Sequence, residues 1–181
     1  MTFPHRHVLE DYIVGFEGTP NPHHLAVVKR PAVLSVLARS GREGDALSVL
    51  GRIETGSARF AGPGEWLLVS EDASASSIAR ELTAAGDDVL HFTDQSDGRV
   101  VLRLAGPSVR KILAKCLAVD VHPDEFVVGA STPTQCCHVV ANLARTGENT
   151  FELILPRSFA GHVFEEIMEM GREYAMTAGF A

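Results

Sequence analysis

Hydrophobic and polar positions are most clearly patterned between residues 94 and 129, where an alternating segment is followed by a helical one. Apolar and polar residues alternate over Arg99–Ala105, which predicts a strand directly after the turn signal Asp97-Gly98. Gly106-Pro107 is expected to end the strand and open a helix, because proline fits the first helical position. The apolar stripe of this helix would be Val109, Ile112, Leu113, Cys116 and Leu117.

Shorter patterns predict the remaining strands and their turns. Alternating or β-branched runs favour strands at residues 33–39, 66–70, 89–93, 134–145 and 151–155. Glycine and proline at 62–64 predict a tight turn before the second of these strands. Residues 146–149 are expected to turn the chain between the last two strands, which would then form a hairpin.

Three further helices follow from apolar spacing and capping residues. Residues 45–51 predict a short helix with Leu47 and Leu50 inward. A second helix, capped by Ser74 or Asp72, is expected to stop at Gly86. Ser158 would cap the last helix, whose stripe at helical spacing is Phe159, Val163, Ile167, Met170 and Tyr174.

The order of these elements predicts an α+β fold. From Trp66 the order is strand, helix, strand, strand, helix, strand, which is a ferredoxin-like βαββαβ unit. Short links between strands favour a mixed or antiparallel sheet with helices packed on it. We expect residues 25–181 to form a single domain and residues 1–24 to form an extended N-terminal arm.

The arm and one face of the sheet are candidates for contact with a partner. Residues 1–24 hold prolines and only one short apolar group, Tyr12–Phe16, so they are expected to order on a partner subunit. Val101, Val140 and Ile154 occupy positions that would be wet in a one-sided sheet, and Phe180 adds a tail contact. The arm is the favoured surface.

Composition limits the class of partner and compartment. The chain has 181 residues and a formal net charge of −7, which argues against binding a nucleic-acid backbone. Three cysteines without CxxC spacing fit a reducing cytosol. Apolar runs fall short of the about 20 residues that span a bilayer, and the N-terminus lacks a signal-peptide pattern. We therefore expect a cytoplasmic protein with no membrane partner.

Few side-chain groups suggest chemistry, and we expect no catalytic, cofactor-binding or metal site. Cys136 and His138 would share one strand face, where they could be metal ligands or a thiol with a base; Cys116 and His122 are further ligand candidates. The arm histidines are expected to be solvated: His5, His7, His23 and His24. Adjacent carboxylates are expected to be surface charge: Asp87-Asp88, Asp124-Glu125 and Glu165-Glu166.

Several motifs carry a resemblance in their order and spacing. These are GEWLLVS at 64–70, LAGP at 104–107, VDVHPDEFVVG at 119–129, TFEL at 150–153 and LPRSFA at 155–160. Over about residues 31–174 the chain resembles the folate-binding family typified by the glycine-cleavage aminomethyltransferase. Within that family it is most similar to the gamma (small) subunits of heterotetrameric sarcosine oxidases.

The resemblance implies an aminomethyltransferase-like α+β fold and a non-catalytic role in assembly with a large alpha subunit, beside beta and delta subunits. Such complexes oxidise sarcosine to glycine and form methylenetetrahydrofolate when folate is present. FAD, FMN, NAD and tetrahydrofolate would be bound by the partner subunits and none by this chain.

One departure from the family concerns folate. Aminomethyltransferases carry acidic groups that engage folate on the strand corresponding to residues 134–140, where this chain reads TQCCHVV without a carboxylate. Folate binding is therefore carried over to no residue. The alternatives are a stand-alone folate-binding protein, a folate-dependent aminomethyltransferase-like enzyme, a gamma-like subunit of an N-methylglutamate dehydrogenase complex, or an assembly module with unrelated partners.

Overall fold

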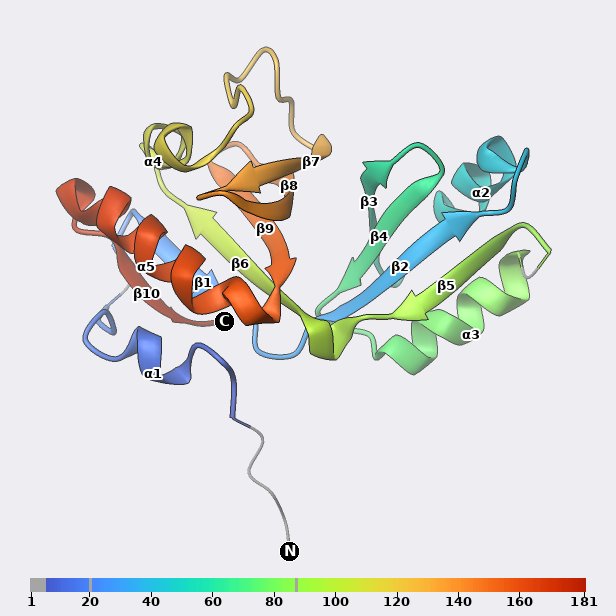
Figure 1. The fold of residues 1–181 in the computed structure, drawn as a ribbon, viewed down its shortest axis with the longest axis horizontal. Coiled ribbons are helices and arrows are strands. Elements are labelled where there is room, and N and C mark those ends of the chain that lie inside the picture. Colours follow the sequence, from blue (N-terminus) through green and yellow to red (C-terminus); the bar gives the residue numbers. More distant parts are fainter. Residues whose placement is uncertain (1–5, 20, 87) are drawn as a thin grey trace, which may run out of the picture.

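The computed structural model describes residues 6–19, 21–86 and 88–181, which form two sheets arranged as two lobes (Figure 1). The larger sheet contains, in spatial order, β10 (Thr177–Phe180), β1 (His24–Val27), β6 (Arg99–Ala105), β9 (Thr150–Pro156), β8 (Val139–Gly147) and β7 (Ser131–Cys136). The smaller contains β3 (Ser57–Gly62), β4 (Glu65–Ser70), β2 (Ala32–Ala38) and β5 (Leu90–Asp94). Strand pairing is parallel between β1 and β10 and antiparallel between the other described neighbours.

Helices pack on one face of each sheet, so the α+β class is confirmed. The larger lobe carries α1 (Glu10–Ile13), α4 (Val109–Cys116) and α5 (Ala160–Gly171), with the 3-10 turns η1 (Ser96–Gly98), η2 (Arg157–Phe159) and η3 (Arg172–Tyr174) at its connections. The smaller carries α2 (Glu43–Leu50) and α3 (Ala75–Gly86). Among the described residues, no helix has the length and apolar character needed to cross a membrane.

The smaller lobe is itself a ferredoxin-like βαββαβ unit. β2, α2, β3, β4, α3 and β5 follow one another along the chain, and β2 lies between β4 and β5 in the sheet. The elements predicted from Trp66 onward occur in the predicted order, but the chain passes to the larger sheet between β5 and β6. The unit begins two strands and one helix earlier than predicted, at β2, because β3, which is largely exposed, shows no alternation that would reveal it.

Each lobe has its own core, and a third cluster joins them. Val100, Leu102 and Leu104 of β6 face the helices of the larger lobe, as predicted. The opposite face of the sheet is also buried: Val101 and Ile154 pack against the smaller sheet together with Val28, Val33, Leu67 and Val69. The prediction that Val101 and Ile154 await a partner subunit is therefore wrong, because the second sheet covers them.

The N-terminal segment packs on its own chain. Leu9 and Ile13 are buried in the larger core, and Tyr12 and Phe16 each meet the ring of Phe164 edge-on. The expectation that this segment lacks a packed element is wrong, because α5 supplies the apolar surface that the segment does not contain. The boundary between residues 24 and 25 stays a prediction.

The predicted strand over residues 134–145 is two strands. Cys137 and His138 form a two-residue turn with φ of 49° and 67°, so β7 ends at Cys136 and β8 starts at Val139. This is the left-handed backbone that two-residue hairpins need, and the usual sequence signal for it is glycine, asparagine or aspartate. Neither Cys137 nor His138 gives that signal.

Two helix predictions need local correction. Leu47 is 57% exposed, while Ala46, Val49 and Leu50 form the buried side of α2. Ser158 lies within η2, and Phe159 occupies the N-cap position of α5. The buried stripe of α5 begins at Ala160, one residue after the predicted Phe159, and it includes Ala160, Val163, Phe164, Ile167, Met168 and Gly171.

Candidate functional site

Cys136 and His138 do not share a strand face. Cys136 is buried at the end of β7, whereas His138 is the second residue of the turn. His122 lies on the loop after α4, with Nδ1 3.6 Å from Asp124 Oδ2. The described residues contain no group of three or more histidine, cysteine or acidic side chains that could hold a metal.

His7, His23 and His24 are half-buried and hydrogen-bonded, so the expectation that they are solvated is wrong. His7 Nδ1 accepts from the Leu9 amide at 3.1 Å, and His23 Nε2 accepts from the Ser108 amide at 3.0 Å. His24 Nδ1 is hydrogen-bonded to Thr177 Oγ1 at 2.7 Å, across the pairing of β1 with β10. These contacts fasten the segment to the lobe. His5 lies outside the described residues.

The adjacent carboxylates described by the structure lie at or near the surface. The side chains of Asp88 and Asp124 are 80% and 86% exposed. Glu125 and Glu165 are exposed and Glu166 is half-buried, while Asp87 lies outside the described residues. Phe180, predicted as a tail contact, is partly buried in β10, where its ring meets His7 edge-on.

A buried carboxylate that the sequence did not reveal connects the two lobes. Glu152 of β9 accepts hydrogen bonds from Arg59 Nη2 of β3 and, at 2.7 Å, from Arg103 Nε of β6. Arg103 also pairs with Glu71, which follows β4. In the sequence, Glu152 is a lone carboxylate in the apolar run of residues 151–155, and Arg103 lies in the alternating run of residues 99–105. Neither feature shows that Glu152 pairs with an arginine of the other lobe.

The electrostatics of Glu152 favour its charged form. Burial opposes ionisation of the carboxyl group, but the charges and hydrogen bonds of Arg59 and Arg103 outweigh that effect and lower the pKa of Glu152. Arg59 and Glu152 are both buried, so each charge offsets part of the free-energy cost of burying the other. The network is therefore a structural connection between lobes.

A second buried charge fixes the loop between α4 and β7. Arg145 of β8 is buried, and its Nη1 donates to the carbonyl oxygens of Phe126 at 2.7 Å and Pro123 at 3.2 Å. Its Nε and Nη2 donate to the carbonyl oxygens of Gly147 and Glu148 at the β8–β9 turn. The loop is thereby held against the sheet, although it projects from the larger lobe in Figure 1.

Four large apolar side chains are exposed along this loop and the neighbouring strands. Val127 and Val128 of the loop are each 55% exposed, Val140 of β8 is 64% exposed, and Phe60 of β3 is 43% exposed. We call these four residues the hairpin patch. Phe60 is tied to the β7–β8 hairpin because its amide donates to Ser131 Oγ at 2.8 Å and its carbonyl accepts from Asn142 Nδ2 at 2.7 Å.

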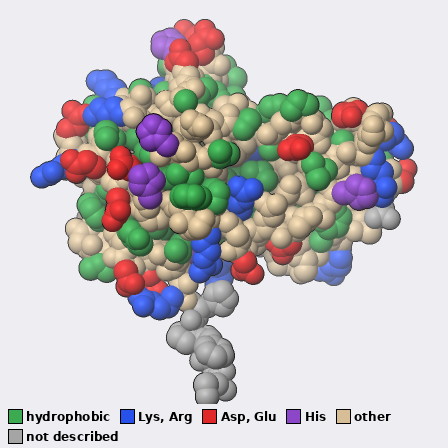
Figure 2. All heavy atoms as spheres, viewed as in Figure 1, with side chains coloured by type: hydrophobic (Ala, Val, Ile, Leu, Met, Phe, Trp, Pro, Cys, Tyr) green, Lys and Arg blue, Asp and Glu red, His purple; other side chains and the backbone are tan. Residues whose placement is uncertain are grey.

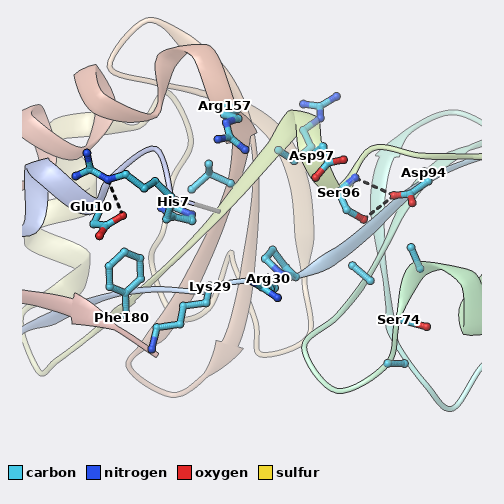
Figure 3. Close-up of a pocket in the computed structure, with 17 residues that line it drawn as sticks. His7, Glu10, Lys29, Arg30, Ser74, Asp94, Ser96, Asp97, Arg157 and Phe180 are labelled. Atoms are coloured by element: carbon cyan, nitrogen blue, oxygen red, sulfur yellow. Dashed lines mark hydrogen bonds and ion pairs between the residues drawn. The ribbon is translucent and has the colours of Figure 1, made fainter. Parts of the chain in front are cut away.

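The two lobes, with a narrower region between them, are visible in Figure 2. A groove of about 610 Å³ is lined by residues from both lobes. Arg30 and Arg157 line it from different elements, and Asp94 and Asp97 contribute acidic groups (Figure 3). His7 also lines it, and burial, followed by the charge of Arg157, lowers the pKa of this histidine. The groove carries charges of both signs, and within its lining Ser96 Oγ donates to Asp94 Oδ1 at 2.6 Å while accepting from the Val33 amide at 3.0 Å, so this pair fixes the η1 turn against β2.

Comparisons with known sequences agree on one family. The model of the family described as "Sarcosine oxidase, gamma subunit family" matches residues 31–172. "Sarcosine oxidase subunit gamma" of Arthrobacter sp. is 31% identical over 146 residues, which cover 80% of this chain and 70% of the relative. The protein of the same name from Corynebacterium sp. (strain P-1) is 31% identical over 128 residues, 70% of this chain. That match spans 62% of the Corynebacterium relative, less than two thirds of its length.

Aminomethyltransferases are more distant relatives and share part of the fold. The enzyme of Herpetosiphon aurantiacus is 29% identical over 113 residues, 61% of this chain and 31% of the relative. Among solved structures, heterotetrameric sarcosine oxidase from Corynebacterium sp. U-96 contains a chain with a TM-score of 0.77 and 23% identity, covering 94% of this chain and 96% of that one. Aminomethyltransferase T of Bartonella henselae has a TM-score of 0.63 and 16% identity, covering 88% of this chain and 48% of that one. This chain belongs to the sarcosine oxidase gamma subunit family.

Proposed function

We propose that this chain is the gamma subunit of a heterotetrameric sarcosine oxidase and acts as a non-catalytic partner of the large alpha subunit, beside the beta and delta subunits. The observation that carries the proposal is the family match over residues 31–172. The fold likeness, which spans nearly the whole of both chains, supports it. The complex would be cytoplasmic, since the three cysteines are free thiols, as a reducing compartment favours.

In this proposal the complex oxidises sarcosine to glycine and forms methylenetetrahydrofolate when folate is present. FAD, FMN, NAD and tetrahydrofolate are bound by the partner subunits. Residues 134–140 of this chain hold thiols, an imidazole and aliphatic groups but no carboxylate, which does not fit the acidic folate contact of the aminomethyltransferases. The buried Glu152 is engaged by two arginines. We assign no catalytic, cofactor-binding or metal residue.

The large alpha subunit binds the hairpin patch in this proposal. An obligate interface has an apolar centre. Val127 and Val128 are exposed apolar side chains on the loop that Arg145 holds in place, and Val140 is exposed on the neighbouring strand β8. A surface fixed before binding loses less conformational entropy when the partner arrives. The N-terminal segment, which the sequence favoured, is a weaker candidate because its rings pack on α5.

Co-expression with the large alpha subunit tests the role. We expect the two chains to co-purify in equal amounts, and the isolated chain to be colourless, without oxidase activity and without saturable folate binding by calorimetry. A yellow isolated chain, or micromolar folate binding, would support a stand-alone folate protein instead. Activity of the complex on N-methylglutamate but not on sarcosine would support the N-methylglutamate dehydrogenase alternative.

A matched pair of variants tests the surface. Val128→Asp places a charge in the hairpin patch and should reduce recovery of the alpha subunit at least about tenfold, because a desolvated unpaired charge is costly at an interface. Leu47→Asp is the control, since Leu47 is equally exposed but lies on α2 of the other lobe. Equal loss with both variants, or with Leu47→Asp alone, would reject the hairpin patch while leaving the subunit role intact.

A further inference from the structure

All the cysteines of the chain converge at one place, where α4 ends and the β7–β8 turn begins. Cys116 is the last residue of α4, Cys136 is the last residue of β7, and Cys137 is the first residue of the turn. The sulfur atoms of Cys136 and Cys137 lie 4.0 Å apart, and all three side chains are free thiols. The sequence separates Cys116 from the others by about twenty positions, so this grouping comes from the fold.

Backbone hydrogen bonds set Cys116 opposite Cys137. Leu117 and Cys136 form an antiparallel bridge, with the Cys137 amide donating to the Cys116 carbonyl at 2.8 Å and the Ala118 amide donating to the Gln135 carbonyl at 3.2 Å. The bridge is isolated, because Cys116 ends α4 and Cys137 belongs to the turn, so the backbone hydrogen bond between these two residues sets their spacing. Hydrogen-bonded opposed residues in antiparallel pairing have Cα atoms about 5.5 Å apart. Disulfides need a Cα separation of about 4.4–6.8 Å.

The same criterion disfavours a bond between Cys136 and Cys137. Consecutive Cα atoms are about 3.8 Å apart, which is below the range that disulfides span without strain. Cys136 is also fully buried, whereas Cys137 is half-buried at the tip of the hairpin, where a small oxidant can reach it while the chain is not bound to the alpha subunit. The geometry therefore pairs Cys116 with Cys137 and leaves Cys136 as their neighbour.

The surroundings of Cys137 favour its thiolate. The neighbouring thiols of Cys116 and Cys136, together with the charges of His162 and His138, outweigh burial and lower the pKa of Cys137 to about 3. The Cys116 thiol also donates to the Ile112 carbonyl oxygen at 3.5 Å. The hydrogen-bonding interaction with Cys137, followed by burial, raises the pKa of both Cys116 and Cys136. The charge of Glu166 raises the pKa of Cys116 slightly further, and the charge of Lys115 lowers it slightly. His162 of α5 is fixed nearby, with Nε2 3.2 Å from the Cys137 carbonyl oxygen. Thiolates, not thiols, attack peroxides and disulfides.

We propose that Cys137 and Cys116 are a redox pair that closes a reversible disulfide when the protein meets a hydroperoxide. The Cys137 thiolate attacks one peroxide oxygen, forming an S–O bond and breaking the O–O bond, so that a sulfenic acid and hydroxide result. The Cys116 sulfur then attacks Cys137 Sγ, forming the S–S bond; its proton and the leaving hydroxide become water. Two thiols are oxidised by two electrons and hydrogen peroxide is reduced to two waters, while a dithiol reductant reverses the reaction.

Peptide mapping of the full chain tests this pairing. The purified protein is treated with hydrogen peroxide, its remaining thiols are blocked with N-ethylmaleimide, and it is digested without reduction. We expect one cross-linked peptide pair joining Cys116 to Cys137, with Cys136 alkylated, and its loss after dithiothreitol. A Cys136–Cys137 linkage, or alkylation of all three cysteines after peroxide, would overturn the proposal.

Variants assign the roles of the three sulfurs. Cys136→Ser should retain the cross-link, whereas Cys116→Ser should leave a sulfenic acid on Cys137 that dimedone traps. Cys137→Asn should abolish both products, and asparagine is chosen because it tolerates the left-handed backbone of the turn. Circular dichroism establishes that each variant is folded. A cross-link that persists in Cys137→Asn, or dimedone labelling at Cys136 in Cys116→Ser, would refute the assignment.

Discussion

The two lobes differ in how their cores are completed. The smaller lobe is a continuous segment, from β2 to β5, and its helices α2 and α3 come from within it. The larger lobe needs both ends of the chain, because β1 and β10 pair with each other and Leu9 and Ile13 fill its core. The smaller lobe is therefore completed within residues 32–94, across which β2 pairs with β5, whereas the larger lobe draws on residues from both ends of the chain.

The lobes also differ in what they leave accessible. Three of the four residues of the hairpin patch and all of the cysteines belong to the larger lobe. The smaller lobe contributes Phe60 at the boundary and the Arg59 side chain that reaches Glu152. In our proposals the larger lobe provides the partner contact and the thiol chemistry, and the smaller lobe supports it through the ion pair of Arg59 with Glu152.

The largest expected effect comes from breaking the ion network between the lobes. Glu152→Gln keeps the side-chain shape but leaves Arg59 buried without an anion, and removing one partner of a buried ion pair costs about 3–5 kcal/mol. Urea unfolding measures the loss. Glu71→Gln is the control, because the Glu71 side chain is 38% exposed and a pair that exposed contributes about 0–1 kcal/mol. Equal losses in the two variants would mean that the buried carboxylate does not hold the lobes together.

Truncation of the N-terminal contact comes next and distinguishes the lobes. Leu9→Ala should destabilise the protein by about 2–5 kcal/mol, because it leaves a cavity in the core of the larger lobe. Val14→Ala is the matched control, since Val14 is exposed on the same segment. If Leu9→Ala unfolds at the same urea concentration as Val14→Ala, the segment is a loosely attached arm, as the sequence suggested.

Acid should produce a smaller and graded effect. The folded-state pKa of Glu152 is lowered, so its contribution to stability is complete above the unfolded pKa, about 4.3 for glutamate, and is lost as pH falls through the folded value. The stability difference between the natural protein and Glu152→Gln should therefore shrink below about pH 4. Urea midpoints measured between neutral pH and pH 3 give this difference. A difference that stays constant over that range would contradict the assigned pKa direction.

The sequence predicts regular interior elements well and contacts between elements poorly. Alternation defined β6 with its bounds, whereas the following helix begins at Val109 with Ser108 at the N-cap position, so Pro107 precedes the helix and does not occupy its first position as predicted. Short strands such as β1 and β10 have four residues each, too few for a period to show. The family resemblance rests on the order and spacing of several motifs, because no single motif is distinctive by itself.

The candidate sites were less predictable for a physical reason. Cys137 and His138 adopt positive φ without the residues that usually announce it, so their turn, and with it the opposition of Cys116 to Cys137, was hidden. Glu152 lies on the face of β9 opposite Phe151, Leu153 and Leu155, and that face is buried only because the second sheet covers it. Both sites depend on which surfaces meet, and a one-dimensional pattern does not contain that information.

Hydrogen–deuterium exchange of this chain with and without the large alpha subunit tests the central claim most directly. We expect binding to slow amide exchange in peptides that cover residues 127–140, the loop and hairpin of the larger lobe. Peptides that cover residues 43–50 of α2 should exchange at the same rate in both samples. Protection confined to α2 and α3, or to residues 10–16, with none at 127–140, would contradict the account.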